Sequence, residues 1–330
     1  MIYTTITPEE FSDWVNLCGG GFEMVPDEFY DHFVNDPDAD YNGVFVAIDD
    51  SVAHGGGECV SFCSAERGNM TPLRGRMVSS VRIFTRTMYL GGCEIKCGAV
   101  GEVCTLREYR GRGLSGKLLT MAIEYMKNSG FSVSQLFTGV NDHYARYGWF
   151  TVPLQYADVR LSGDAARDVT LRCAEERDVP ALCRLHDRFA RSLDGVFVRR
   201  NYGRQYWIDW MVRNPGHRLV ACYGDEVVAY ADFHVDGGRL KFREFLGEDE
   251  FMLPLFVRIA SEYAFGADVL YDVPRPIADR LSLSVVGTHE RRDCMYRLNS
   301  AFEVGGKVVD CDDALRSLLC SAATFEADNY

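Results

Sequence analysis

The glycine-rich stretch VCTLREYRGRGLSGKLL, residues 103–119, has residue types and spacing that could bind phosphate. Its glycines, Gly111, Gly113 and Gly116, fit the G-x-G-x-x-G pattern of dinucleotide-binding loops. The outer glycines and the following lysine fit most of a nucleotide-triphosphate P-loop. Arg110 and the glycines and serine after it nearly fit a third pattern, R-x-x-G-x-G/A, of loops that bind the pyrophosphate of an acyl coenzyme. Each pattern implies a different chemistry.

Local chemistry separates the three patterns. A P-loop needs a hydroxyl directly after its lysine to hold magnesium, and here Leu118 follows Lys117. A dinucleotide loop follows the first strand of a βαβ unit directly, whereas here the charged run REYR separates a late strand from the glycines. The third pattern is compatible with the whole stretch, because backbone N–H groups would converge at a helix beginning near Leu114, with Arg110 and Arg112 adding positive charge.

The longer segment GAVGEVCTLREYRGRGLSGKLL resembles the acyl-coenzyme loop of the GCN5-related N-acetyltransferases (GNAT superfamily), in particular the Eis-like branch with tandem acetyltransferase folds. The resemblance is close over residues 95–150, where DHYARYGWF is similar to the family's Tyr-x-x-x-Gly-aromatic segment. It implies acetyl-CoA as co-substrate and a splayed mixed sheet whose gap admits the pantetheine arm. The residues it assigns to acetyl-CoA binding are Val103, Cys104, Thr105, Arg110, Gly111, Arg112, Gly113, Leu114, Ser115 and Gly116.

The same resemblance assigns the general acid to Tyr144, four residues before Gly148, although a packed aromatic residue of a short helix is the alternative. Two features depart from the family. Ser115 stands where the family usually has glycine or alanine, and only 28 residues follow MYRLNSAF, whereas Eis-like enzymes carry a third domain whose terminal carboxylate acts as base. The base is therefore left unassigned, with Tyr330 offering a terminal carboxylate; a structural role is favoured for Glu102.

The elements around the loop fit a mixed α/β unit. Short strands and helices are expected before residue 50, an irregular insertion within residues 51–76, and two long strands joined at Gly91-Gly92. The helix after the loop has apolar residues on one face, and it is followed by the strand FSVSQLFTG, the short helix DHYARYG and one last strand, WFTVPLQYADVRL.

The second half repeats this order but lacks a basic glycine loop, for it has FLGEDEFMLP, whose three acids would repel a pyrophosphate. We therefore expect an α/β (α+β mixed sheet) protein of two tandem GNAT-like folds. The first, residues 1–165, carries the acetyl-CoA loop; the second, residues 166–330, is degenerate and has a short C-terminal extension. The boundary is expected within SGDAARD, residues 162–168. The second fold is expected to form part of the wall of the acceptor site.

Composition limits the partners. The 330 residues carry a net charge of −13, which argues against nucleic acid and favours a cationic small molecule. The sequence has neither a membrane-length apolar run nor a secretory signal, and its 12 dispersed cysteines indicate reduced thiols, so a cytoplasmic location without membrane binding is expected. The two C-x3-C pairs, Cys59/Cys63 and Cys93/Cys97, are not assigned a metal. Homo-oligomerisation is left open.

Together these features predict an acetyl-CoA-dependent N-acetyltransferase that acts on a primary amine of a small, cationic molecule. The alternative is a non-catalytic acyl-CoA-binding regulatory module, which the loopless second half would fit.

Overall fold

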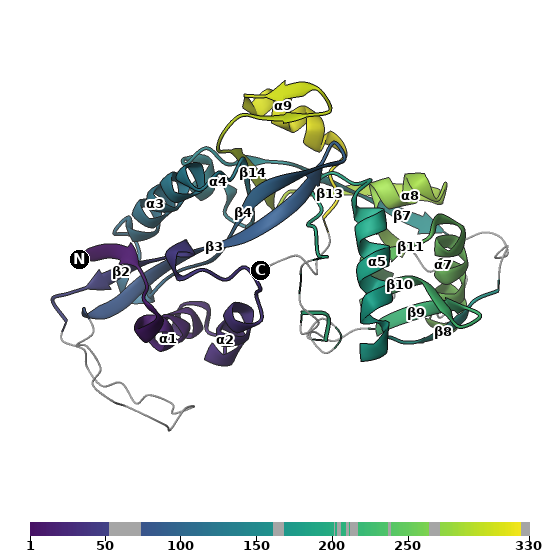
Figure 1. Ribbon diagram of the computed structural model, residues 1–330, viewed down its shortest axis with the longest axis horizontal. Coiled ribbons are helices and arrows are strands. Elements are labelled where there is room, and N and C mark those ends of the chain that lie inside the picture. The colour runs from purple at the N-terminus through teal and green to yellow at the C-terminus, as the bar shows by residue number, and fades with distance from the viewer. Residues whose placement is uncertain are drawn as a thin grey trace.

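The computed structural model describes residues 1–52, 74–160, 168–200, 202, 206–208, 211, 217–236, 239–263 and 271–324. Outside these residues lie most of the insertion within residues 51–76, residues 162–167 of the predicted boundary segment, and Cys59, Cys63 and Tyr330. The chain forms two lobes, each built on a seven-stranded mixed sheet (Figure 1). The predicted α/β class with two tandem mixed sheets is confirmed.

The first sheet has the strand order β1-β2-β3-β4-β5-β14-β6. Its strands are β1 (Ile2–Thr5), β2 (Val44–Asp49), β3 (Arg76–Leu90), β4 (Cys93–Thr105), β5 (Val133–Phe137), β6 (Phe150–Thr151) and β14 (Cys294–Leu298). Helices α1 (Phe11–Phe22) and α2 (Pro26–Val34) cover one face, and α3 (Leu114–Asn128) and α4 (Asn141–Ala145) lie on the other (Figure 1). Two apolar clusters on opposite sides of the sheet hold these helices in place.

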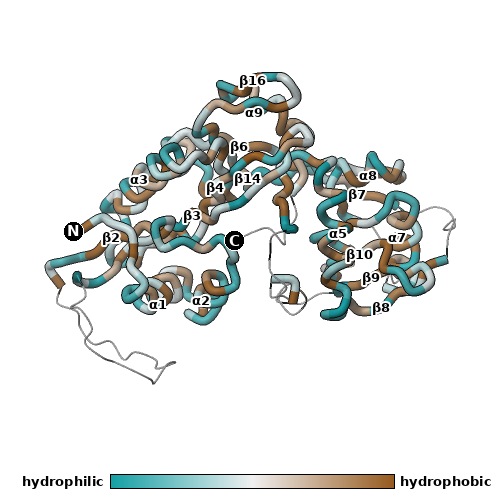
Figure 2. Tube along the Cα trace, viewed as in Figure 1, coloured by the Kyte–Doolittle hydropathy of each residue, from teal (hydrophilic) through white to brown (hydrophobic). Residues whose placement is uncertain are grey.

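The second sheet has the order β8-β9-β10-β11-β12-β7-β13. Its strands are β7 (Leu154–Arg160), β8 (Thr170–Cys173), β9 (His217–Tyr223), β10 (Glu226–Asp236), β11 (Arg239–Gly247), β12 (Tyr271–Pro274) and β13 (Ser284–Arg291). Helices α5 (Val179–Ala190), α7 (Asp249–Tyr263) and α8 (Arg275–Arg280) pack on it. The hairpin β15 (Phe302–Val304) and β16 (Lys307–Val309) and helix α9 (Asp312–Leu318) follow β14. Figure 2 shows hydrophobic stretches along the strands of both sheets.

The two sheets exchange one strand each. The single strand predicted over WFTVPLQYADVRL is two strands, β6 and β7, and only β6 stays in the first sheet. The sixth position of the first sheet is filled instead by β14, from the far end of the chain, while β7 fills the sixth position of the second sheet. Pro153 lies at the break, where its missing N–H and fixed φ interrupt the strand.

The exchange is tightly packed. β14 pairs antiparallel with β5 from Cys294 opposite Phe137 to Leu298 opposite Val133. Tyr296 is fully buried, and Gln135 Nε2 donates to its hydroxyl over 2.7 Å. The far end of β3 adds a second connection, because Tyr89 N donates to the Val196 carbonyl over 2.9 Å. The lobes are therefore joined through their cores.

No helix in the described ranges is long and apolar enough to cross a membrane.

The exchange predicts that a fragment of residues 1–165 does not fold stably. It lacks β14, whose Cys294, Met295 and Tyr296 are each at most 1% exposed. Removing one large buried side chain lowers the free energy of unfolding by about 2–5 kcal/mol. The free energy of unfolding of a whole domain is only about 5–15 kcal/mol. In circular dichroism melts we expect no cooperative transition for the fragment and partial recovery when the peptide RDCMYRLNS, residues 292–300, is added. A scrambled peptide is the control, and a fragment that melts cooperatively alone would contradict the prediction.

Candidate functional site

An opening in the first sheet lies where β4 and β5 part. These parallel strands pair only from Cys97 opposite Val133 to Ala99 opposite Gln135, although β4 continues to Thr105. On its other edge β4 stays paired with β3, as Cys104 opposite Ser80 and Thr105 opposite Ser79. The backbone of β4 beyond Ala99 therefore has a ladder on one edge and no β5 partner on the other. This is the divergence that the resemblance implies.

A bulge marks the unpaired part of β4. Ser80 pairs with Cys104 but Arg82 pairs with Gly101, so two residues of β4, Glu102 and Val103, lie opposite the single residue Val81 of β3. Glu102 takes the left-handed conformation there, with φ of 50°, which is uncommon for a residue that is not glycine. This local conformation explains why Glu102 breaks the in-out alternation of the strand, and it turns the carboxylate toward α2.

Buried charges surround that carboxylate. Glu102 is 5% exposed and accepts from Arg82 Nη1 at 3.3 Å, while His32 Nδ1 lies 3.5 Å from its other oxygen. Arg82 also donates to Asp36 over 3.0 Å. Sequence reasoning did not identify His32, Asp36 or Arg82; the one available signal was an arginine inside the apolar strand MVSSVRIFTRTMYL. Glu102 thus takes part in a buried ionic cluster beside the opening.

The glycine loop leads from the end of β4 into α3. Gly111 and Gly113 have φ of 77° and 74°, a backbone conformation that favours glycine. A Cβ atom added at either position would meet nothing within 4 Å, so there is open space next to both Cα atoms. Gly113 is the N-cap residue, and no side chain caps α3.

The start of α3 offers backbone donors. Lys117 N donates to the Gly113 carbonyl over 3.2 Å, the first turn of the helix. Backbone N–H groups in the first turn of a helix have no acceptor within the helix. In α3 these are the groups of Leu114, Ser115 and Gly116, which precede Lys117 in the chain. Together with the helix dipole they form an end suited to an anion.

The loop arginines are held by the loop itself. Arg110 Nε donates to the Thr105 carbonyl over 3.0 Å, and Arg112 Nη2 donates to the Glu108 carbonyl over 3.0 Å. Arg112 also lies over the ring of Tyr109, 4.7 Å from its centroid. Both arginines are exposed, so they add positive charge at the helix end while fixing the loop backbone.

Gly116 is required for a reason that sequence reasoning missed. A Cβ there would lie 1.9 Å from the hydroxyl of Tyr147 and 2.9 Å from its Cζ. Tyr147 comes from the turn after α4, so its side chain packs against the first turn of α3. The last glycine of the loop therefore makes room for a tyrosine of the neighbouring segment.

Tyr144 lies in α4, with its ring in the apolar cluster between the sheet and α3. It is 8% exposed and its ring packs edge-on against Trp149, 6.2 Å between centroids. Burial raises the pKa of Tyr144 to about 12. The phenol is therefore neutral, and able to donate a proton, throughout the physiological pH range.

The corresponding end of α7 in the second lobe is filled by the protein's own charges. Glu248, Asp249 and Glu250 line a cavity of about 280 Å³ there together with Arg188 and Arg280. Arg188 Nη1 lies 3.2 Å from Glu248, and Arg280 Nη2 lies 2.6 Å from Asp249. Acids in the first turn already complement the helix dipole, so an added anion would compete with them.

The contact between Gly116 and Tyr147 gives a stability prediction. Gly116→Ala should lower the free energy of unfolding by about 1–3 kcal/mol through overpacking, although alanine favours a helix by about 1 kcal/mol. In the Tyr147→Ala background the same change should cost less, because the clash is gone. Urea denaturation of the four proteins measures this coupling; strictly additive effects would show that the two residues do not meet.

Comparisons with known proteins agree with this geometry. Residues 3–152 match the family model described as an acetyltransferase (GNAT) domain. No match is found among curated protein sequences. Among solved structures, a GCN5-related N-acetyltransferase from Kribbella flavida is 18% identical, with a TM-score of 0.63 over 90% of this chain and 70% of that one. Another from Anabaena variabilis is 14% identical, with a TM-score of 0.66 over 92% and 76%.

Eis1 from Mycobacterium abscessus is 14% identical, with a TM-score of 0.61 over 94% of this chain and 85% of that one. At these identities the structural likeness concerns the fold, and it extends over both lobes. The family match covers the lobe with the glycine loop. Residues 3–152 thus match a GNAT acetyltransferase domain, and the whole chain shares its fold with these solved structures.

Proposed function

We propose that this protein is an acetyl-CoA-dependent N-acetyltransferase of the tandem Eis-like kind, acting on a primary amine of a small, cationic molecule. The observation that carries the proposal is the continuity of one path. The unpaired edge of β4, the open glycine loop and the uncapped start of α3 follow one another along the chain, beside a sheet opening. That order suits a ligand with a narrow amide-bearing arm and a diphosphate.

The residues present fit such a ligand. The pantetheine arm would take the place of a neighbouring strand and form hydrogen bonds with the backbone of Val103, Cys104 and Thr105. The loop from Gly111 to Gly116, through its N–H groups, would hold the diphosphate, with Arg110 and Arg112 supplying countercharge. When bound, acetyl-CoA supplies an activated acetyl group.

Tyr144 would then act as the general acid. It follows β5, the strand that borders the opening, and no described residue forms a hydrogen bond with its hydroxyl group. A neutral phenol can donate to a thiolate of pKa about 8–10. Its raised pKa of about 12 keeps that proton in place at every pH at which the protein would work.

The acceptor is proposed to be cationic because the chain carries a net charge of −13, which raises the local concentration of cations.

We place acetyl-CoA binding in residues 1–165 only, because acids fill the corresponding helix end in residues 166–330. A cytoplasmic location is proposed, since the ten cysteines among the described residues are free thiols.

The main test is turnover. Acetyl-CoA with a panel of polyamines, aminoglycosides and amino acids should release free thiol with at least one amine. Saturable acetyl-CoA binding by calorimetry without thiol release for any amine would instead favour the regulatory module, and the absence of binding would reject both.

Gly113→Glu should abolish acetyl-CoA binding. The new carboxylate would face the diphosphate and disturb N–H donors, each worth about 1.5–3 kcal/mol toward a charged group, so we expect a loss of at least about 100-fold. Gly130→Glu is the matched control, because Gly130 also has φ of 74° and open space but lies beyond the other end of α3. Calorimetry should show near-normal affinity for the control; equal losses in both variants would mean that backbone strain, not the loop, is responsible.

Tyr144→Phe should lower kcat by about 10²- to 10⁴-fold and leave acetyl-CoA affinity nearly unchanged. Since its pKa is about 12, Tyr144 should cause no fall in the wild-type rate between pH 7 and pH 10. Tyr125→Phe is the control, because the pKa of that phenol is also about 12 but its hydroxyl group is bonded to Asp40. Wild-type turnover by Tyr144→Phe, with chemistry rate-limiting, would make Tyr144 a packing residue.

A further inference from the structure

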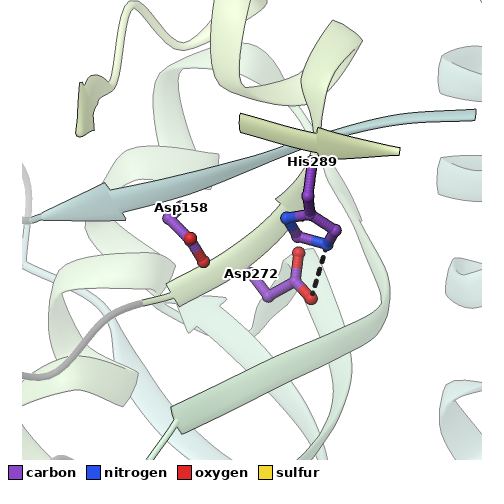
Figure 3. Close-up of side chains that lie close together, drawn as sticks. All are labelled: Asp158, Asp272 and His289. Atoms are coloured by element: carbon purple, nitrogen blue, oxygen red, sulfur yellow. Dashed lines mark ion pairs between the residues drawn. The ribbon is translucent and has the colours of Figure 1, made fainter. Parts of the chain in front are cut away.

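Three potential metal ligands meet on the second sheet, away from the glycine loop. Asp158 comes from β7, Asp272 from β12 and His289 from β13, and each offers a ligand atom within 4.8 Å of the others. Figure 3 shows the three side chains converging from their strands. Within the described part of the chain this is the one group of three or more such residues with this spacing.

The strand register explains why they meet. Asp158 and Asp272 are direct partners across the antiparallel pair of β7 and β12. His289 is the partner of Tyr156, two residues before Asp158, and its ring stacks on that tyrosine, 5.6 Å between centroids. His289 thus reaches across β7, and its Nε2 lies 3.4 Å from Asp272 Oδ2.

The two carboxylates lie where a cation would be favoured. Like charges directly opposite each other on neighbouring strands destabilise a sheet, and removing water from around them strengthens the repulsion. The Asp272 side chain is only 16% exposed, and Asp158 is half-buried. A positive ion between them would lower the repulsion between the two carboxylates.

The donor set matches a divalent metal ion. Ligand bonds of about 2.1 Å put neighbouring ligand atoms about 3.0–3.4 Å apart, which the separation of His289 from Asp272 already meets. Rotation of the Asp158 carboxylate would bring in the third ligand. Gly287, opposite Asp158 on β13, has no side chain in the way; a Cβ there would lie 3.3 Å from Asp158 Oδ2. The His289 side chain is 38% exposed, so water can complete the coordination.

We propose that Asp158, Asp272 and His289 form a binding site for one divalent first-row metal ion, with Mn²⁺ or Zn²⁺ as the class of ligand. The site would tie the exchanged strand β7 to its neighbours β12 and β13 in the second sheet. Its role would therefore be to hold the exchange in place, and it does not depend on the proposed acetyltransferase activity.

Mn²⁺ is the probe for the test, because thiolates favour Zn²⁺ and the chain has 12 cysteines. After chelator treatment the full chain is titrated with Mn²⁺, and the free ion is followed by electron paramagnetic resonance. We expect one ion per chain and a melting temperature that rises with Mn²⁺. Asp158→Asn and His289→Gln should each weaken binding by at least about tenfold and abolish the rise.

Glu290→Gln is the matched control, because it removes a carboxylate next to His289 that bonds Gln155 and Arg292 instead. It should bind Mn²⁺ within about twofold of wild type. If Asp158→Asn fails to fold, the Mn²⁺ titration of His289→Gln, which changes the edge strand β13, still tests the proposal. If Lys241, the partner of Asp272 on β11, balances the carboxylates, Mn²⁺ will not bind. That result, or binding unchanged in both variants, would overturn the proposal.

Discussion

The separation of β4 from β5 is the feature on which the rest of the first lobe depends. A central strand normally pairs on both edges, because buried backbone groups without partners cost free energy. Here pairing with β5 stops at Ala99, and the next six residues of β4 keep only β3 as a neighbour. A ligand that supplies strand-like hydrogen bonds would complete that edge. The bulge at Glu102, the loop and α3 all follow within the same continuous segment.

The strand exchange keeps that opening in a rigid frame. β5 could not part from β4 and remain ordered without a partner on its other edge, and β14 supplies this partner along all five residues of β5. The chain that provides β14 has first passed through the whole second lobe, while β7 has moved in the opposite direction. Each lobe therefore needs a strand from the other, and the loopless second lobe has a structural task even without a ligand of its own.

Sequence reasoning could predict the parts of this structure that depend on local chemistry. The glycine loop indicated a helix beginning near Leu114, and α3 begins at Leu114. It could not predict the strand exchange, since WFTVPLQYADVRL has the same alternation whichever sheet it joins. The contact of Gly116 with Tyr147 and the ion pair of Arg82 with Glu102 join residues 20 or more positions apart, so no local pattern reveals them. Tyr144 could be placed on a short helix, but the apolar cluster that raises its pKa is tertiary.

The two lobes show how one architecture can keep its core and change the exposed start of its long helix. In both, a bulged strand leads to a long helix, and a buried arginine pairs with a glutamate of that strand: Arg82 with Glu102, and Arg199 with Glu244 at 2.9 Å. Such pairs are buried, so losing one partner would leave an uncompensated charge. The helix ends are exposed, and there the cost of change is small. At the start of α3, glycines and arginines leave backbone N–H donors accessible to an anion. At the start of α7, acidic side chains already interact with the helix dipole. The exposed helix ends can thus differ between the two lobes while the buried pairs preserve the common frame.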